Sequence, residues 1–310
     1  MSALADIAVV IPTRNRVAVL HKALDTLAAQ TLLPAEVIIV DASDEQQVEV
    51  RQQLTGAFAE KGVILNWVKA TQQGAAAQRN QGVALARYPF ILFMDDDAYL
   101  EPDVAEKLWT GMQTLPRAGG INAMIKNQQY TTPGTITRWM CNILSDKKAA
   151  TYAGRIIGPA WNLLPEDRDD LPEYVPCEWL NTTCTLYRKE ALPSPVFQSH
   201  FTGYSLMEDV SLSVQVGKSW GLYNARTARI YHDSQPGQHK SSVYALARME
   251  LVNRHYVMTK VLERRSAKDY FRFYLFQLFG IGMGLTSAKG WKNLFPTIFG
   301  KLSGFIRVLK

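Results

Sequence analysis

Short apolar runs alternate with amphipathic segments through the first third of the chain. Four of these runs are bounded by polar residues or proline, so each predicts a buried strand. The predicted strands are 7–12, 36–41, 63–68 and 90–94. After the first strand, one helical face is formed by Val17, Leu20, Leu24 and Leu27. Strands and helices that alternate at this spacing are typical of a parallel α/β sheet with right-handed crossovers.

Proline and aspartate residues indicate where the elements begin. Pro34 predicts a break before the second strand, and Asp44 is placed to cap the polar helix that follows it. Residues 75–87 predict an alanine-rich helix, and Pro102 opens another. The apolar face of that last helix consists of Val104, Leu108, Met112 and Leu115. Ligands of such a sheet bind beyond the carboxyl ends of the strands, so the residues after each strand are candidates for chemistry.

The middle of the chain has a different character. Residues 125–175 are rich in glycine, proline and polar residues, with isolated aromatics, and predict loops and short strands that cover a site. Residues 178–187 predict another strand that enters the core. In the segment 210–216 apolar residues occupy alternate positions, and this periodicity alone favours a strand.

The composition changes near residue 240. Residues 242–263 predict a long helix. The next segment, 270–285, is strongly apolar, but it is 16 residues long and includes Arg272 and Gln277. A helix that spans a bilayer needs about 20 apolar residues, so this segment is too short to cross one.

The final helix carries an apolar stripe with basic residues beside it. The stripe consists of Trp291, Leu294, Phe295, Ile298, Phe299, Leu302, Phe305, Ile306 and Leu309. The residues off the stripe include Lys292, Lys301, Arg307 and Lys310. Basic amphipathic helices of this kind lie in membrane interfaces. The alternative is that the stripe packs on the rest of the protein, and the coincidence of basic charge with aromatic residues favours the membrane.

The charge distribution also points to an anionic partner for this end of the chain. Residues 240–310 carry a net charge of +10, whereas residues 1–239 carry −4. A basic tail on a mildly acidic body indicates contact with an anionic surface such as a membrane or a nucleic acid.

Cysteine use and the N-terminus favour a reducing compartment. Cys141, Cys177 and Cys184 form no C-x-x-C pair and give no zinc signature. The first residues lack a basic region followed by a long apolar stretch. We therefore expect a cytoplasmic protein that associates peripherally with the inner face of the cell membrane.

An acidic run follows the fourth predicted strand. In FILFMDDDAYLEPD, residues 90–103, three consecutive carboxylates end an apolar segment. An ordinary surface turn is the alternative interpretation, but the buried strand would fix Asp95, Asp96 and Asp97 at the ligand-binding edge. Oxygen ligands suit Mg²⁺ or Mn²⁺, and both ions favour sites shared with phosphate oxygens. A second acidic pair, Glu208 and Asp209, follows much later in the chain, and it could equally be the acidic start of a helix.

Together these motifs resemble those of the inverting glycosyltransferases of family 2, of the type that builds bacterial surface polysaccharides. The motifs are VVIPTRNR, IIVDASD, GAAAQRNQG before FILFMDDD, EWLNTTCTLYRKEAL, MEDVSL and YHD, in that order. They cover roughly residues 5–235, and they are specific as an ensemble although each is weak alone. The resemblance implies a GT-A fold, which is a Rossmann-like mixed α/β sheet flanked by helices. It also implies a helix at 208, against the alternating pattern there.

The resemblance assigns roles to individual residues. Those implied for donor binding are Pro12, Thr13, Arg14, Asp41, Arg79, Asp95 and Asp96. Those implied for a Mn²⁺ or Mg²⁺ ion are Asp97, Asp95 and His232, although a hydrogen-bonded surface histidine is an equal alternative for His232. Asp209 would be the catalytic base, and Glu208 would position the acceptor or the base. An inverting transfer needs a base on one face of the sugar and charge neutralisation on the other, and two carboxylate clusters supply both.

Other features are less specific. Trp161, Trp179 and Tyr204 are candidate stacking surfaces for an acceptor sugar, although such residues more often pack in a core. Members of the family often have an arginine a few residues after the acidic pair, where this chain has Gln215 and Lys218.

These implications combine into one architecture and one reaction. Residues 1–239 would form the catalytic domain, with a nucleotide-binding half (1–120) and an acceptor-side half (121–239), and residues 240–310 a basic helical extension that associates with the membrane. The reaction would move a sugar from a nucleotide-diphosphate sugar, with UDP preferred, to a lipid-linked or glycan acceptor in capsule, O-antigen or exopolysaccharide synthesis. Its partners would be the donor, a polyprenyl-diphosphate-linked or glycan acceptor and the anionic inner leaflet, and not a nucleic acid.

Two other functions remain open at this point. One is a membrane-bound scaffold with a catalytically degenerate nucleotide-sugar site. The other is a sugar-1-phosphate nucleotidyltransferase, which normally has a glycine-rich loop after the first strand, where this chain reads PTRNRVAV. A dinucleotide oxidoreductase is disfavoured because no G-x-G-x-x-G follows a strand.

Overall fold

A computed structural model describes residues 3–45, 47–146, 148–234 and 242–309. The strands are β1 (Ala3–Thr13), β2 (Leu32–Asp41), β3 (Ile64–Lys69), β4 (Phe90–Met94), β5 (Ala98–Leu100), β6 (Ala118–Ile125), β7 (Ile156–Ile157), β8 (Trp161–Asn162), β9 (Tyr174–Pro176), β10 (Cys184–Arg188) and β11 (Gly221–His232). The helices are α1 (Val17–Ala28), α2 (Val48–Glu60), α3 (Ala75–Leu85), α4 (Val104–Thr114), α5 (Thr135–Leu144), α6 (Glu208–Gly217), α7 (Val243–Tyr256), α8 (Ala267–Gly284) and α9 (Ala288–Val308), with a short 3₁₀ helix η1 (Lys189–Ala191) and a π-helical turn η3 (Val257–Val261).

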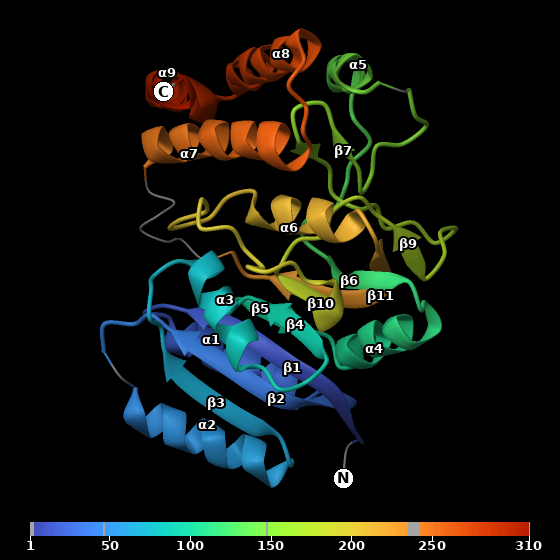
Figure 1. Ribbon diagram of the computed structural model, residues 1–310, viewed down its shortest axis with the longest axis vertical. Helices are drawn as coiled ribbons and strands as arrows, with labels where there is room; N and C mark the ends of the chain where they lie inside the picture. Colours follow the sequence, from blue (N-terminus) through green and yellow to red (C-terminus); the bar gives the residue numbers. More distant parts are fainter. Residues whose placement is uncertain (1–2, 46, 147, 235–241, 310) are drawn as a thin grey trace.

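Nine of these strands form one mixed sheet (Figure 1). The strand order is β3-β2-β1-β4-β10-β6-β11-β5, and β9 pairs with β11. The predicted parallel arrangement is confirmed for β1 to β4, whereas β10, β5 and β9 run antiparallel to their neighbours. The sheet is therefore mixed, as the family resemblance implies.

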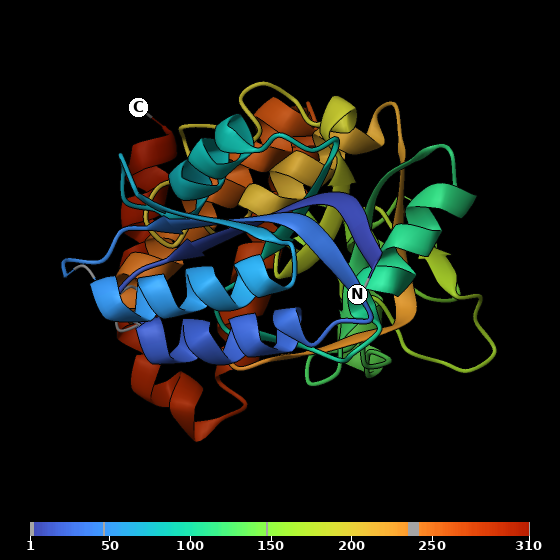
Figure 2. The ribbon, with the colours of Figure 1, turned by 90° about the horizontal axis from the view of Figure 1, so that it is seen from below.

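Alternate side chains of β1 pack into different cores, so both faces of the sheet are covered. Ile7, Val9 and Ile11 pack into one core with α1, α2 and α4, while Ala8 and Val10 pack into a second core with α3 and α6. Figure 2 shows α1 and α2 on one side of the first strands and α3 on the other. A strand that is buried on both faces is apolar at every position, which is the pattern that the sequence shows.

Three local predictions are wrong. Pro34 lies inside β2, where a register shift in the pairing with β1 lies beside it. Asp44 does not cap α2, because the helix begins after Gln47 and Asp44 instead accepts a hydrogen bond from the side-chain amide of Asn15 (2.8 Å). The strand predicted at 178–187 begins only at Cys184.

The segment 125–175 contains short strands, as predicted, but also the helix α5, which was not predicted. Its buried residues Met140, Cys141 and Leu144 pack in a small core with Tyr152 and with residues of α8. This core depends on a helix more than 120 residues later in the chain, so no local pattern reports it.

The helix α6 forms although its apolar residues alternate. Val210, Leu212 and Val216 are buried, and so are Ser211 and Ser213 between them. The helix is therefore enclosed on most sides, and a helix that is buried all around loses the 3.6-residue period. The prediction of a helix from the family resemblance is confirmed.

The predicted tail helices are also confirmed, and they form a layer of their own (Figure 1). The helix α9 packs on α7 through Gly300 and Gly304, where a Cβ atom would lie 2.4 Å from the carbonyl oxygen of Tyr244 and 3.1 Å from a side-chain carbon of Leu251. Most side chains of the apolar stripe are exposed and therefore do not pack on α7. Within the residues that the structure describes, every helix is too short or too polar to span a bilayer.

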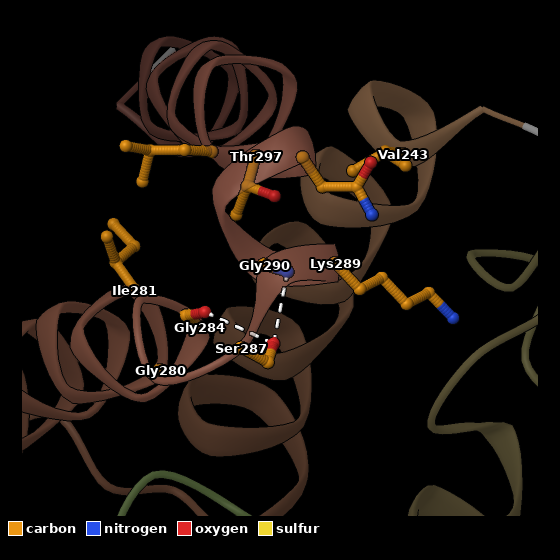
Figure 3. A pocket seen from close by; sticks show the side chains of 10 residues that line it. Val243, Gly280, Ile281, Gly284, Ser287, Lys289, Gly290 and Thr297 are labelled. Atoms are coloured by element: carbon orange, nitrogen blue, oxygen red, sulfur yellow. Dashed lines mark hydrogen bonds between the residues drawn. The ribbon is translucent and has the colours of Figure 1, made fainter.

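A small cavity of about 300 Å³ lies where α8 meets α9. Figure 3 shows Ser287 between the two helices, where its hydroxyl accepts a hydrogen bond from the amide of Gly290 (3.1 Å) and donates one to the carbonyl of Gly284 (3.4 Å). No carboxylate lines this cavity among the described residues, so it is distinct from the acidic site described next.

Candidate active site

The acidic run lies at the carboxyl end of β4, beside the end of β1. Val10 pairs with Phe93 in the parallel register, so three residues further on Thr13 lies beside Asp96. The Thr13 hydroxyl donates to the Asp96 carboxylate (2.7 Å), and both groups are buried. Arg16 donates to Asp96 (3.2 Å) and to Asp97 (3.4 Å). The turn after β1 therefore supplies the groups that hold the middle and last carboxylates.

Asp95, Asp97 and His232 form a compact cluster of possible metal ligands. One ligand atom from each lies within 4.8 Å of the others, and Nε2 of His232 is 3.1 Å from the Asp97 carboxylate. The side-chain amide of Gln128 lies 3.1 Å from the other ring nitrogen, which fixes the orientation of the imidazole. Two carboxylates and one imidazole are a donor set that fits Mn²⁺ or Mg²⁺.

The second acidic pair opens α6. The loop before it contains Gly203, Ser205 and Met207 with positive φ (63°, 56° and 73°), so the chain turns sharply into the helix. The Asp209 carboxylate accepts a hydrogen bond from the amide of Val210 (2.8 Å). Backbone amides and the helix dipole favour negative charge at this end of α6.

Arg79 joins the two acidic clusters. Its guanidinium donates to Asp95 (2.6 Å) and to Glu208, and all three side chains lie within the protein wall of the same cavity. Burial opposes the charge on Arg79, but the neighbouring Glu208 and Asp95 carboxylates outweigh it and raise the pKa of the guanidinium. Arg79 therefore stays charged. It binds Asp95, which is 16 positions away in the chain, and Glu208, which is 129 positions away.

Burial makes these carboxyl groups less acidic than usual. It raises the pKa of Glu208 to about 7, against the opposing effect of Arg79. The pKa of Asp209 is raised by burial to about 6, although the hydrogen bond from the Val210 amide lowers it. The pKa of Asp96 is likewise raised by burial to about 6, with Thr13 opposing. A carboxyl group with a pKa near 6 is well matched to accept a proton at neutral pH.

Both clusters line one cavity of about 790 Å³. Of the residues predicted for the site, its wall contains Pro12, Thr13, Arg14, Arg79, Asp95, Asp96, Asp97, Tyr204, Glu208, Asp209 and His232. Counting the described residues of the wall, six carboxylates face four guanidinium groups. The excess negative charge suits a divalent cation, which would in turn attract a diphosphate.

Three predicted residues lie elsewhere. Asp41 is outside the wall of this cavity and accepts hydrogen bonds from Nε1 of Trp67 (3.0 Å) and from the amide of Ser43 (2.8 Å). Trp179 is buried and donates to the carbonyl of Leu163, while Trp161 packs against aromatic rings of α8. The two tryptophans therefore do not face the cavity, because each completes an apolar core.

Sequence reasoning missed several residues of the cavity wall. Gln78 donates to the carbonyls of Thr13 (2.9 Å) and Val40 (2.7 Å), so it ties together the ends of β1 and β2. Glu250 and Arg254 reach the cavity from α7, which lies in the tail. Gln78 and Arg16 lie within the motifs GAAAQRNQG and VVIPTRNR, which is a signal for both residues, whereas no local pattern connects α7 to the site.

Lys218 does not replace the arginine that family members often have after the acidic pair, because it places no charge in the cavity. Its ammonium group is exposed and lies 3.9 Å from the Glu263 carboxylate, away from the cavity wall. Gln215 donates to the carbonyl of Ser211 within its own helix. The guanidinium groups in the wall come instead from the turn after β1, from α3 and from α7.

Comparison with known proteins identifies the family. The sequence profile described as Glycosyl transferase family 2 matches residues 8–193, which is more than half of the chain. The chain belongs to glycosyl transferase family 2. Among curated relatives, an uncharacterized glycosyltransferase of Haemophilus influenzae is 34% identical over 116 residues. That match covers 37% of this chain and 36% of the relative, so the chain spans little more than a third of the relative's length.

Solved structures confirm the GT-A fold of this family 2 chain. The mannosyltransferase PcManGT from Pyrobaculum calidifontis, in complex with GDP-Man and Mn²⁺, superimposes with a TM-score of 0.58 at 11% identity, covering 98% of this chain and 87% of that one. GalNAc-T7 with UDP, GalNAc and Mn²⁺ gives a TM-score of 0.56 at 12% identity, covering 81% of this chain and 47% of that one. At these identities the likeness concerns the fold alone.

Proposed function

We propose that this protein is a metal-dependent inverting glycosyltransferase. It would move a sugar from a nucleotide-diphosphate sugar, with UDP as the preferred nucleotide, to a lipid-linked or oligosaccharide acceptor in bacterial surface-polysaccharide synthesis. The observation that carries the proposal is that two acidic clusters, more than 100 residues apart in the chain, line one cavity. The fold neighbours named above hold nucleotide groups together with Mn²⁺, which supports a donor of this class.

Asp95, Asp97 and His232 would hold the Mn²⁺ or Mg²⁺ ion, and its charge would stabilise the leaving nucleotide diphosphate. Pro12, Thr13 and Arg14 would contact the nucleoside at the end of β1, with Asp41 further along the same edge.

Asp209 would accept the proton of the acceptor hydroxyl as its oxygen bonds to the anomeric carbon. The bond from that carbon to the diphosphate oxygen breaks, and the electron pair leaves with the diphosphate. A carboxylate in this position contributes about 10²–10⁴-fold to the rate. Arg79 and Glu208 would fix the position of Asp209 relative to the metal cluster, because Arg79 forms ion pairs with both Glu208 and Asp95.

The division into a catalytic domain (1–239) and an extension (240–310) remains part of the proposal, with one addition. Glu250 and Arg254 of the extension belong to the cavity wall, and Arg254 also donates to the carbonyl of Ala160 (2.5 Å). The extension would therefore complete the acceptor side of the site as well as bind the inner leaflet.

A panel of sugar nucleotides tests the proposal. The chelated protein is mixed with UDP-, dTDP- or GDP-sugars and with a polyprenyl-diphosphate-linked or glycan acceptor that receives the sugar, with and without Mn²⁺. Thermal stabilisation and release of the nucleoside diphosphate are measured. Stabilisation and release that both require Mn²⁺ support a transferase. A protein that binds donors but never releases the diphosphate would be the degenerate scaffold, and one that makes sugar-1-phosphate and nucleoside triphosphate from the donor and pyrophosphate would be a nucleotidyltransferase.

A further inference from the structure

Large apolar side chains are exposed on α5, α8 and α9, which lie along one end of the molecule (Figure 1). We call this surface the apolar face and define it by Ile136, Trp139, Phe271, Leu278, Phe295 and Phe299. Each of these side chains is more than half exposed. An apolar surface to which several elements contribute is typical of an interaction site.

The opposite side of each helix is buried, so the apolar face looks outward. The glycines of α9 pack on α7. Phe273 of α8 packs with Leu251 and Met258 of the α7 region. In α5 the buried Cys141 lies on the opposite side of the helix from Ile136 and Trp139. The helices α8 and α9 pack on α7 with their other sides. Among the described residues, none covers the side chains of the apolar face.

Basic side chains accompany the apolar face. Arg138 of α5 and Lys289 and Lys292 of α9 are exposed, and in the part of the chain that the structure describes no carboxylate forms an ion pair with them. The sequences of the three helices contain a single acidic residue, Asp269. Its carboxylate accepts hydrogen bonds from Ser266 at the start of α8.

These charges decide between two occupants of the face. A second copy of this chain would bring the same basic residues together across a two-fold axis, and like charges in such a contact repel. A bilayer with anionic headgroups would instead attract them while its acyl region receives the aromatic side chains. The charge pattern therefore favours a lipid surface.

We propose that α5, α8 and α9 together dock on an anionic phospholipid surface, and that α5 is a membrane contact outside the basic tail. The proposal rests on the membrane partner of the proposed function, but not on the transfer reaction. Lys301 of α9 binds Glu250 of α7 (2.9 Å), and Glu250 lines the acidic cavity. Docking would thus hold the cavity one or two helix layers, roughly 10–20 Å, from the lipid. An acceptor whose lipid anchor stays in the bilayer could reach that height.

Co-sedimentation with vesicles tests the proposal. The full chain is mixed with vesicles of phosphatidylcholine alone or of phosphatidylcholine with phosphatidylglycerol, and the bound fraction is measured. The wild type should bind the anionic vesicles more tightly, by about fivefold for each basic residue that nears the surface. Trp139→Glu on α5 and Phe299→Glu on α9 should each weaken binding by about tenfold or more, because each removes a large apolar contact and adds a negative charge.

Val48→Glu is the matched control. Val48 is also about half exposed (52%), but it lies on α2 at the other end of the molecule, so this variant should bind like the wild type. Melting temperature and Mn²⁺-dependent stabilisation by UDP should be unchanged in all three variants, which separates loss of docking from loss of the fold or of the donor site. Ile136→Glu repeats the test if Trp139→Glu melts early.

Two results would overturn the proposal. If Phe299→Glu loses binding while Trp139→Glu and Ile136→Glu bind like the wild type, the contact is confined to the tail. If the wild type ignores anionic vesicles and is a dimer that Trp139→Glu converts to a monomer, the face binds a second copy. Failure of diphosphate release with normal vesicle binding would refute the transfer reaction alone.

Discussion

Replacing Arg79 by glutamine should destabilise the protein strongly and in a pH-dependent way. The change removes the buried guanidinium that pairs with Asp95 and Glu208 while leaving both carboxylates in place. Removal of one partner from a buried ion pair costs about 3–5 kcal/mol of the free energy of unfolding, because the charge left behind is uncompensated. We expect a loss of this size for Arg79→Gln above neutral pH, in buffer with a chelator so that no metal ion binds the carboxylates.

The pH dependence follows from the raised pKa of Glu208. In the wild type the folded pKa is about 7, and the loss of Arg79 raises it further. A folded pKa above the unfolded value gives stability that is lost as pH rises through the folded pKa. Below about pH 7, Glu208 is protonated in the wild type and in Arg79→Gln. It then contributes little to the difference in the free energy of unfolding between them. The deficit of the variant should therefore be larger at about pH 8.5 than at about pH 6.

Urea denaturation at the two pH values measures this effect. Lys126→Gln is the control, because it removes one partner of an exposed ion pair with Glu101 and should change stability by no more than about 1 kcal/mol at either pH. If Arg79→Gln is as stable as Lys126→Gln at both pH values, the two acidic clusters are not joined by a buried ion-pair network.

Two further predictions concern the proton acceptor and the tail. The transfer rate should fall below about pH 6, because burial raises the pKa of Asp209 to about 6 and the protonated carboxyl cannot accept a proton; a rate that stays flat from about pH 5 to 8 would contradict this role. Gly300→Ala should destabilise the protein by about 1–3 kcal/mol, because the new Cβ would lie 2.4 Å from the carbonyl oxygen of Tyr244. The same change at Gly282, where nothing lies within 4 Å, should stabilise it by about 0.5–1 kcal/mol, and equal effects in a thermal melt would rule out the docking of α9 on α7.

Features that depend on a short stretch of chain could be predicted from the sequence. The first four strands are apolar throughout because both faces of the sheet are covered, and their polar ends mark the ligand-binding edge. Asp95 and Asp97 could be placed at that edge for this reason. The family resemblance, and not periodicity, gave the helix at Glu208.

Features that depend on distant contacts could not be predicted. Nothing near Arg79 in the sequence indicates that Glu208 is its partner, and nothing near α7 indicates that Arg254 reaches the cavity. The prediction that tryptophans stack on a sugar has the same limit. The sequence around Trp179 does not show that its indole N–H donates to the carbonyl of Leu163 in the core. The sequence of α5 alone does not indicate a helix, because its buried residues pack against the distant helix α8.

We propose that Asp209 faces the same donor molecule that the carboxylates after β4 would hold through a metal ion. Asp209→Asn tests it most directly, because asparagine keeps the size of the side chain and removes its ability to accept the proton. The measurement compares Mn²⁺-dependent donor binding with the transfer rate in wild type and variant. We expect unchanged donor binding and a transfer rate that is lower by about 10²–10⁴-fold. Full transfer activity in Asp209→Asn would contradict this proposal.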